Sequence, residues 1–275
     1  MGSECQIRST RVEDLAQLSA RLQAAVRDAG ALALSLFKTP LQNWTKGPAS
    51  SPVCEADIAV DRLLRQRLCG DDGFAWLSEE STDDRGRLAA RYVWIVDPID
   101  GTRAYIAGHP DWAVSAALVE DGRPIAACLY APASDEFFAA TAKAGASRNG
   151  APIAATPGAD LQGARVAGPR HLLERLAAAA PPFTVLPRVR SLALRLARVA
   201  QGACEVAFAG GNSHDWDLAA ADLLVHEAGG ALTAFDGGTV IYNRPVPRHE
   251  MLVAAGRDRH ATLIALLGDK RLAFS

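Results

Sequence analysis

Residues 94–102 read Trp-Ile-Val-Asp-Pro-Ile-Asp-Gly-Thr, an apolar run that ends in two carboxylates held close together by a proline and a glycine. The apolar half predicts a buried strand. Pro98 biases Asp97 toward extended backbone, and Gly101 lets the chain turn sharply. We therefore expect Asp97 and Asp100 to converge at one end of a sheet, where clustered carboxylates suit a hard cation such as Mg²⁺. The plainer interpretation is that both aspartates only shape a turn.

Two further acidic segments favour the metal site. A Glu-Glu pair at residues 79–80 follows a short apolar stretch at residues 74–77. Residues 214–217 read His-Asp-Trp-Asp and precede a helical pattern over residues 218–227. Asp217 would then stand at a helix N-terminus, where the helix dipole favours an anion.

The chain has 275 residues, of which 49% are hydrophobic and 22% charged, as in ordinary globular proteins. Its length and a change of pattern beyond Asn149-Gly150 predict two packed lobes, residues 1–145 and residues 146–275. The opening residues to about Phe37 predict an amphipathic helix, and residues 39–52 predict a loop. Further predictions are a helix from near Asp57, a hairpin around residues 120–123, and a helix over residues 191–201.

The net charge of −2 gives no basic footprint, so a nucleic-acid polymer or an acidic membrane surface is not expected as a partner. Five cysteines lie far apart without a Cys-x-x-Cys pair, which argues against a disulfide framework and a structural zinc site. This cysteine pattern makes a reducing cytoplasm the expected location. No apolar run approaches the roughly 18 residues that a membrane span needs.

At these residues the chain resembles the inositol monophosphatase superfamily of metal-dependent, lithium-sensitive phosphomonoesterases. The resemblance extends from about residue 45 to 240 and includes Lys46. It rests on Glu55-Ala56-Asp57, Glu79-Glu80-Ser81, Asp97 to Thr102, and Trp216-Asp217 with the later Glu227-Ala228-Gly229-Gly230. It implies an α+β fold: a layered α/β/α/β/α sandwich with an antiparallel sheet in the N-terminal lobe and a smaller mixed sheet in the C-terminal lobe.

The resemblance also implies roles for single residues. It places one Mg²⁺ on Glu79, Asp97 and the carbonyl of Ile99, a second on Asp97, Asp100 and Asp217, and allows a third ion. The residues expected to carry catalysis are Asp57, Thr102 and Glu79, with the first two activating a water. The expected substrate contacts are Gly101, Thr102, Arg103, Arg190, Ser191 and Asp217.

Several of these residues keep a second interpretation. Lys46, Glu80 and His214 either join the site or lie outside it. In the second case Lys46 is a solvated lysine, Glu80 is an ion-paired or solvent-facing glutamate, and His214 is a surface histidine. Thr102 could instead cap a helix that starts after Gly101. Arg190 and Ser191 could form a plain helix start.

The chain departs from the family pattern at three positions. Cys54 stands where a threonine is common, and Gly210 stands where inositol monophosphatases carry a glutamate. Arg103 resembles the basic residue of bisphosphate nucleotidases and histidinol phosphatases. We therefore predict a Mg²⁺-dependent phosphomonoesterase acting on a small phosphate ester, first a 3′(2′),5′-bisphosphate nucleotide such as 3′-phosphoadenosine 5′-phosphate. The alternatives are inositol 1-phosphate, histidinol phosphate and, more remotely, a non-catalytic metal- or nucleotide-binding relative; a homodimer is left open.

Overall fold

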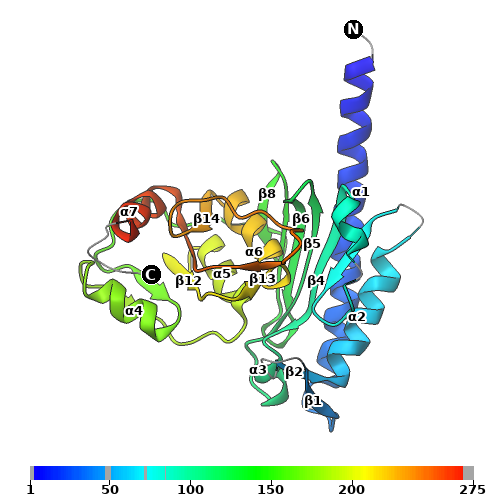
Figure 1. The fold of residues 1–275 in the computed structure, drawn as a ribbon, viewed down its shortest axis with the longest axis horizontal. Coiled ribbons are helices and arrows are strands. Elements are labelled where there is room, and N and C mark those ends of the chain that lie inside the picture. The colour runs from blue at the N-terminus through cyan, green and yellow to red at the C-terminus, as the bar shows by residue number, and fades with distance from the viewer. Residues whose placement is uncertain (1–2, 47–50, 71–72, 84, 269–275) are drawn as a thin grey trace.

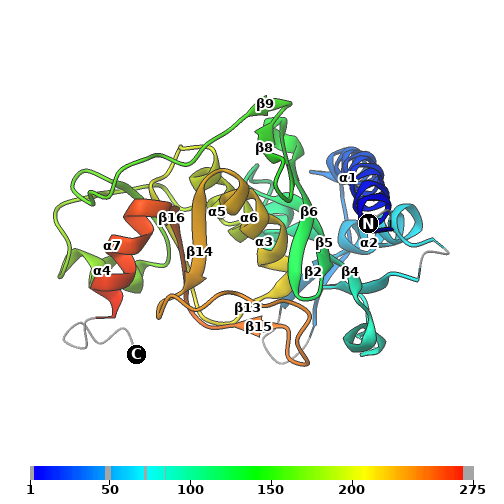
Figure 2. The same cartoon turned by 90° about the horizontal axis from the view of Figure 1, so that it is seen from above.

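The computed structural model of this chain describes residues 3–46, 51–70, 73–83 and 85–268. Its elements stack in five layers, which are helices, sheet, helices, sheet and helices (Figures 1 and 2). This arrangement confirms the predicted layered α+β sandwich. None of the helices in the described residues carries the long apolar stretch that a membrane span needs.

The larger sheet has seven strands in the order β3-β4-β5-β6-β7-β8-β9. Only β3 and β4 run parallel, so the sheet is antiparallel almost throughout, as predicted. The predicted hairpin joins β5 to β6, with positive φ at Asp121 and Gly122, as a type I′ turn requires. The strands are β3 (Ala75–Ser78), β4 (Tyr92–Asp100), β5 (Ala113–Glu120), β6 (Arg123–Ala131), β7 (Glu136–Thr141), β8 (Gly145–Arg148) and β9 (Ala151–Pro152).

Two long helices, α1 (Ser3–Leu36) and α2 (Glu55–Leu68), cover the outer face of this sheet. They bury leucine and valine side chains against Trp94 and Leu118 of the sheet. Burial of apolar surface stabilises the fold by about 25 cal/mol per Å², and this holds α2 against β4. Asp57, in the first turn of α2, is thereby placed near the end of that strand.

The smaller sheet has five strands in the order β11-β10-β12-β16-β14 and is mixed, as predicted. Its strands are β10 (Arg165–Ala167), β11 (Thr184–Val185), β12 (Val206–Ala209), β14 (Gly230–Ala234) and β16 (Leu252–Gly256). Helices α5 (Leu192–Ala200) and α6 (Asp215–Glu227) lie between the sheets, and α4 (Arg170–Ala177) and α7 (Arg257–Leu267) cover the outer face. Small side chains such as Ala219, Ala220 and Ala221 let α6 pack on both sides.

The loop predicted at residues 39–52 is wrong in part. Strands β1 (Asn43–Lys46) and β2 (Ser51–Cys54) pair as an antiparallel ribbon, with Trp44 opposite Val53. Pro52 is tolerated because the ribbon has only two strands and therefore two free edges. Residues 47–50 lie outside the described part of the chain.

Short elements complete the fold: α3 (Thr102–Ile106), the 3-10 turns η1 (Gly86–Ala89) and η2 (Pro132–Ser134), and the paired strands β13 (Ser213–His214) and β15 (Arg248–His249). Strands β8 and β9 belong to the seven-stranded sheet, so the change of sheet comes after residue 152. The division into lobes at residues 145 and 146 stays a prediction.

Candidate active site

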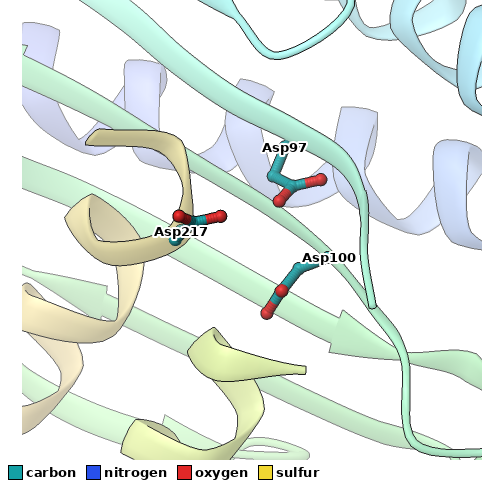
Figure 3. Close-up of side chains that lie close together, drawn as sticks. All are labelled: Asp97, Asp100 and Asp217. Carbon is teal, nitrogen blue, oxygen red and sulfur yellow. The ribbon is translucent and has the colours of Figure 1, made fainter. Parts of the chain in front are cut away.

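Three carboxylates converge where the two sheets meet the middle helices. Asp97 and Asp100 come from the end of β4, and Asp217 comes from the first turn of α6 (Figure 3). One oxygen from each lies within 4.8 Å of the others. Residues three apart on a regular strand face opposite ways, but the pairing of β4 with β5 shifts register between Asp97 and Asp100. This bulge brings both side chains to the same site.

Asp97 is the most deeply buried of the three. It is 1% exposed, and its Oδ1 is a buried oxygen without a hydrogen-bond partner among the described residues. Burial, followed by the charges of Glu79, Asp100 and Asp217, raises its pKa well above the usual range. An unpartnered buried carboxylate oxygen among other carboxylates is costly unless a cation balances it. The donor set therefore fits a hard divalent ion such as Mg²⁺.

Asp100 is held by the start of α5. It accepts hydrogen bonds from Ser191 Oγ at 2.6 Å, Ala193 N at 2.6 Å and Leu192 N at 3.2 Å. Burial raises its pKa to about 7, although these hydrogen bonds act in the opposite direction. Ser191 also accepts from Leu194 N at 3.0 Å and so caps α5. Ser191 therefore contacts the carboxylate cluster and starts a helix, and its contact with substrate stays a prediction.

The predicted pair Asp57 and Thr102 lies beside the cluster, and both side chains are buried. Thr102 Oγ1 lies 3.3 Å from Asp57 Oδ1 and 3.1 Å from the carbonyl oxygen of Ile99. Asp57 Oδ2 accepts from Cys54 N at 2.8 Å and from its thiol at 2.9 Å. Asp57 thus caps the start of α2 and also contacts Thr102. The Cys54 thiol supplies a hydrogen-bond donor at the position where a threonine is common in the family.

Lys46 connects the β1–β2 ribbon to the two glutamates. Its Nζ lies 2.6 Å from Glu80 Oε1, 2.8 Å from the carbonyl oxygen of Glu79 and 3.5 Å from Glu79 Oε1. Glu80 is therefore ion-paired, as one of its two interpretations held. Burial raises the pKa of Glu79 to about 8 despite the nearby lysine, and the like charge of Asp217 acts in the same direction. The charge of Glu79 therefore interacts with the charges of Asp97 and Asp217, although Glu79 is not one of the three residues whose oxygens lie within 4.8 Å of one another.

The remaining predicted residues stand within three positions of Asp100, Ser191 or Asp217 in the sequence. Gly101 has φ of +96°, and a Cβ there would lie 3.2 Å from Asp111 O, so a side chain would be strained. Arg103 is exposed on α3. Arg190 is exposed too, but its Nη1 lies 3.2 Å from Asp111 Oδ1. His214 stacks on Trp216 at 4.6 Å, and its backbone N–H donates to Asp217 Oδ2 at 2.6 Å.

Sequence reasoning missed Asp61, which organises the glutamate loop. It lies in α2 and accepts hydrogen bonds from the hydroxyls of Ser78 and Ser81, which flank the two glutamates. A signal was present, because Asp61 stands four residues after Asp57 and so shares its helix face.

Comparison with known proteins identifies the family to which this chain belongs. The model of the inositol monophosphatase family matches residues 14–271. The chain belongs to this family. It is 32% identical to an inositol-1-monophosphatase of Rhizobium meliloti over 234 residues, which cover 81% of this chain and 87% of that protein. It is 38% identical to a histidinol-phosphatase of Mycobacterium tuberculosis over 208 residues, which cover 69% of this chain and 76% of that protein.

A solved structure agrees with the sequence comparison. The extragenic suppressor protein SuhB from Bartonella henselae superposes with a TM-score of 0.77 at 27% identity, covering 92% of this chain and 99% of that one. Like its phosphatase relatives, this family member is a phosphoric monoester hydrolase.

The raised carboxyl pKa values predict an unusual pH dependence of stability. In the unfolded chain, Asp100 and Glu79 titrate near pH ~4, whereas in the fold their pKa values rise to about 7 and about 8. Between these limits the folded protein binds more protons than the unfolded one, so these groups lower the stability of the metal-free protein as pH rises. We expect the urea midpoint in EDTA to fall between about pH 5 and about pH 8, and Mg²⁺ to reduce that fall. An EDTA midpoint that rises over this range would contradict the assignment.

Proposed function

We propose that this family member is a Mg²⁺-dependent phosphomonoesterase in which Asp97, Asp100, Asp217 and Glu79 hold the ions. The observation that carries the proposal is the buried Asp97 Oδ1, which lies among other carboxylates and has no hydrogen-bond partner in the part of the chain that the structure describes. When bound, the ions supply two effects: they lower the pKa of a water molecule and neutralise charge on the phosphate.

Thr102 and Asp57 have the geometry to direct the attacking water. If the Thr102 hydroxyl donates to Asp57 Oδ1, its oxygen is left to accept a hydrogen bond from water. Asp57 is itself fixed by two donors from Cys54, so this acceptor keeps its place, and the carbonyl oxygen of Ile99 at 3.1 Å is the other acceptor open to the same hydroxyl proton. The water proton then passes to Thr102 as the threonine proton passes to Asp57 and the water oxygen attacks phosphorus. The bond from phosphorus to the ester oxygen breaks, the leaving alkoxide takes a proton from solvent water, and no covalent bond between phosphate and the protein is needed.

For the substrate, we propose a 3′(2′),5′-bisphosphate nucleotide, on the basis of basic groups around the site. Arg103 is exposed directly after Thr102, where a second phosphate could be met. Arg188, three residues before Ser191, lines a pocket of about 740 Å³ together with Phe183 and Arg195, and none of the residues that line this pocket belongs to the carboxylate cluster. A nucleoside with a second phosphate offers both the anionic group and the flat apolar surface that such a pocket suits.

Histidinol phosphate is the second candidate, because the 38% identity to the mycobacterial histidinol-phosphatase is the higher of the two identities given above. The deciding experiment compares phosphate release from adenosine 3′,5′-bisphosphate, histidinol phosphate and inositol 1-phosphate, with Mg²⁺ and with EDTA. A hundredfold preference in kcat/KM, about 2.7 kcal/mol, would establish the substrate. Mg²⁺-independent release, or no release at all, would overturn the metal-dependent mechanism.

Arg103 allows a more specific prediction. The Arg103→Ala variant should raise KM for the bisphosphate about tenfold and leave KM for a monophosphate nearly unchanged, because only the bisphosphate carries a second anion. Steady-state kinetics on both substrates test this. Arg67→Ala, which removes an exposed arginine from α2, serves as the matched control. Equal effects of Arg103→Ala on both substrates would remove the main argument for the nucleotide.

A further inference from the structure

A buried polar network lies behind the first turn of α6, apart from the carboxylate cluster. Arg87 in η1 is 1% exposed and donates from Nε and Nη2 to the two oxygens of Asp83 at 3.0 and 2.7 Å. Its Nη1 donates to Asn243 Oδ1 at 2.8 Å and to Arg244 O at 3.1 Å. All three guanidinium nitrogens therefore have acceptors, as a buried charge requires.

Asn243 connects this arginine to Asp215. The Asn243 side-chain Nδ2 donates back to Arg87 O at 3.0 Å, and its backbone N–H donates to Asp215 Oδ2 at 2.7 Å. His249 Nε2 lies 2.6 Å from the other oxygen, Asp215 Oδ1. Asp215 is fully buried, and both of its oxygens are engaged. Asn243 reaches this position with φ of +59°, which asparagine tolerates better than most residues.

The network meets the site through the start of α6. Asp215 is the first residue of that helix, two positions before Asp217, and its own N–H donates to Pro247 O at 3.1 Å. Strand β15 pairs with β13 directly before the helix. On the other side, Asp83 follows the Glu79 loop by only a few residues. The network therefore joins the two segments that bring Glu79 and Asp217 to the cluster.

We propose that Arg87 and Asp215, joined through Asn243, are positioning residues that fix the direction of the Asp217 carboxylate and thereby set the affinity of the site for its divalent cation. The inference rests on the proposed function, in which Asp217 is a metal ligand. A ligand held in its binding orientation before the ion arrives loses little freedom on binding. Loss of such outer partners commonly weakens metal binding by about 10- to 100-fold.

The test is direct binding of Mn²⁺, followed through the electron paramagnetic resonance signal of the free ion, with far-UV circular dichroism to check folding. We expect Arg87→Met to weaken Mn²⁺ binding about 10- to 100-fold. Asn243→Gly is the milder variant, because glycine keeps the left-handed backbone and the N–H to Asp215 while removing the bridge to Arg87. It should weaken binding in the same direction even if Arg87→Met does not fold.

Arg198→Met is the matched control. It removes an arginine whose nitrogens lie 2.5 and 2.6 Å from the two oxygens of Glu136, at the opposite end of α5 from Ser191. It should lower the melting temperature yet leave Mn²⁺ affinity unchanged. If the parent binds Mn²⁺ and the folded network variants bind it equally tightly, the network is only structural and the inference fails alone. If the parent itself binds no Mn²⁺, the proposed function fails and the inference fails with it.

Discussion

Replacing Asp97 with asparagine should lower kcat/KM by at least about a thousandfold, or about 4 kcal/mol of transition-state stabilisation. Asparagine keeps the size of the side chain but removes the charge at the centre of the carboxylate cluster. The fold should survive, because the lost carboxylate is buried with one oxygen unpartnered and its neighbours are like charges. Phosphate release at saturating Mg²⁺ measures the loss.

Thermal unfolding with and without Mg²⁺ separates this effect from misfolding. The parent protein should gain stability from Mg²⁺ by mass action, and Asp97→Asn should gain much less. Asp222→Asn is a suitable control, since Asp222 is equally buried in α6 but pairs with His226 at 2.7 Å instead of joining the cluster. Near-normal Mg²⁺-dependent turnover by Asp97→Asn would refute the metal assignment.

Local chemistry explains why the centre of the site was predictable from the sequence. The geometry at Asp97 and Asp100 depends mainly on a proline and a glycine within the same five residues. Asp57 and Asp217 each stand three residues after the extended residue that directly precedes a helix. Asp57 accepts the N–H of Cys54 at 2.8 Å, and Asp217 accepts the N–H of His214 at 2.6 Å. Such short-range rules act within one turn of the chain, so periodicity and capping residues reveal them.

The partners of these residues depend on tertiary contacts and could not be predicted in the same way. Lys46 meets Glu80 across 34 residues, and Arg190 meets Asp111 across 79. Nothing in either segment specifies the other, because the sheets and helices between them decide which side chains meet. The β1–β2 ribbon was missed for a related reason: its two four-residue strands carry too little alternation to stand out from a loop.

Removal of the Thr102 hydroxyl should slow the chemical step without weakening metal binding. Valine has the same shape as threonine, so Thr102→Val keeps the packing at the start of α3 and deletes only the group that contacts Asp57. We expect kcat to fall about 10²- to 10⁴-fold, the usual contribution of a positioned proton acceptor. Thr102→Ser, which restores the hydroxyl, should recover most of the activity.

The double variant Asp57→Asn/Thr102→Val makes the test sharper. If the two residues act as one unit on the same water, the second substitution adds little to the first, because the proton path is already broken. If they act independently, the two losses multiply. Single-turnover phosphate release at saturating Mg²⁺ distinguishes the two outcomes, and multiplying losses would mean that Thr102 and Asp57 do not share one proton path.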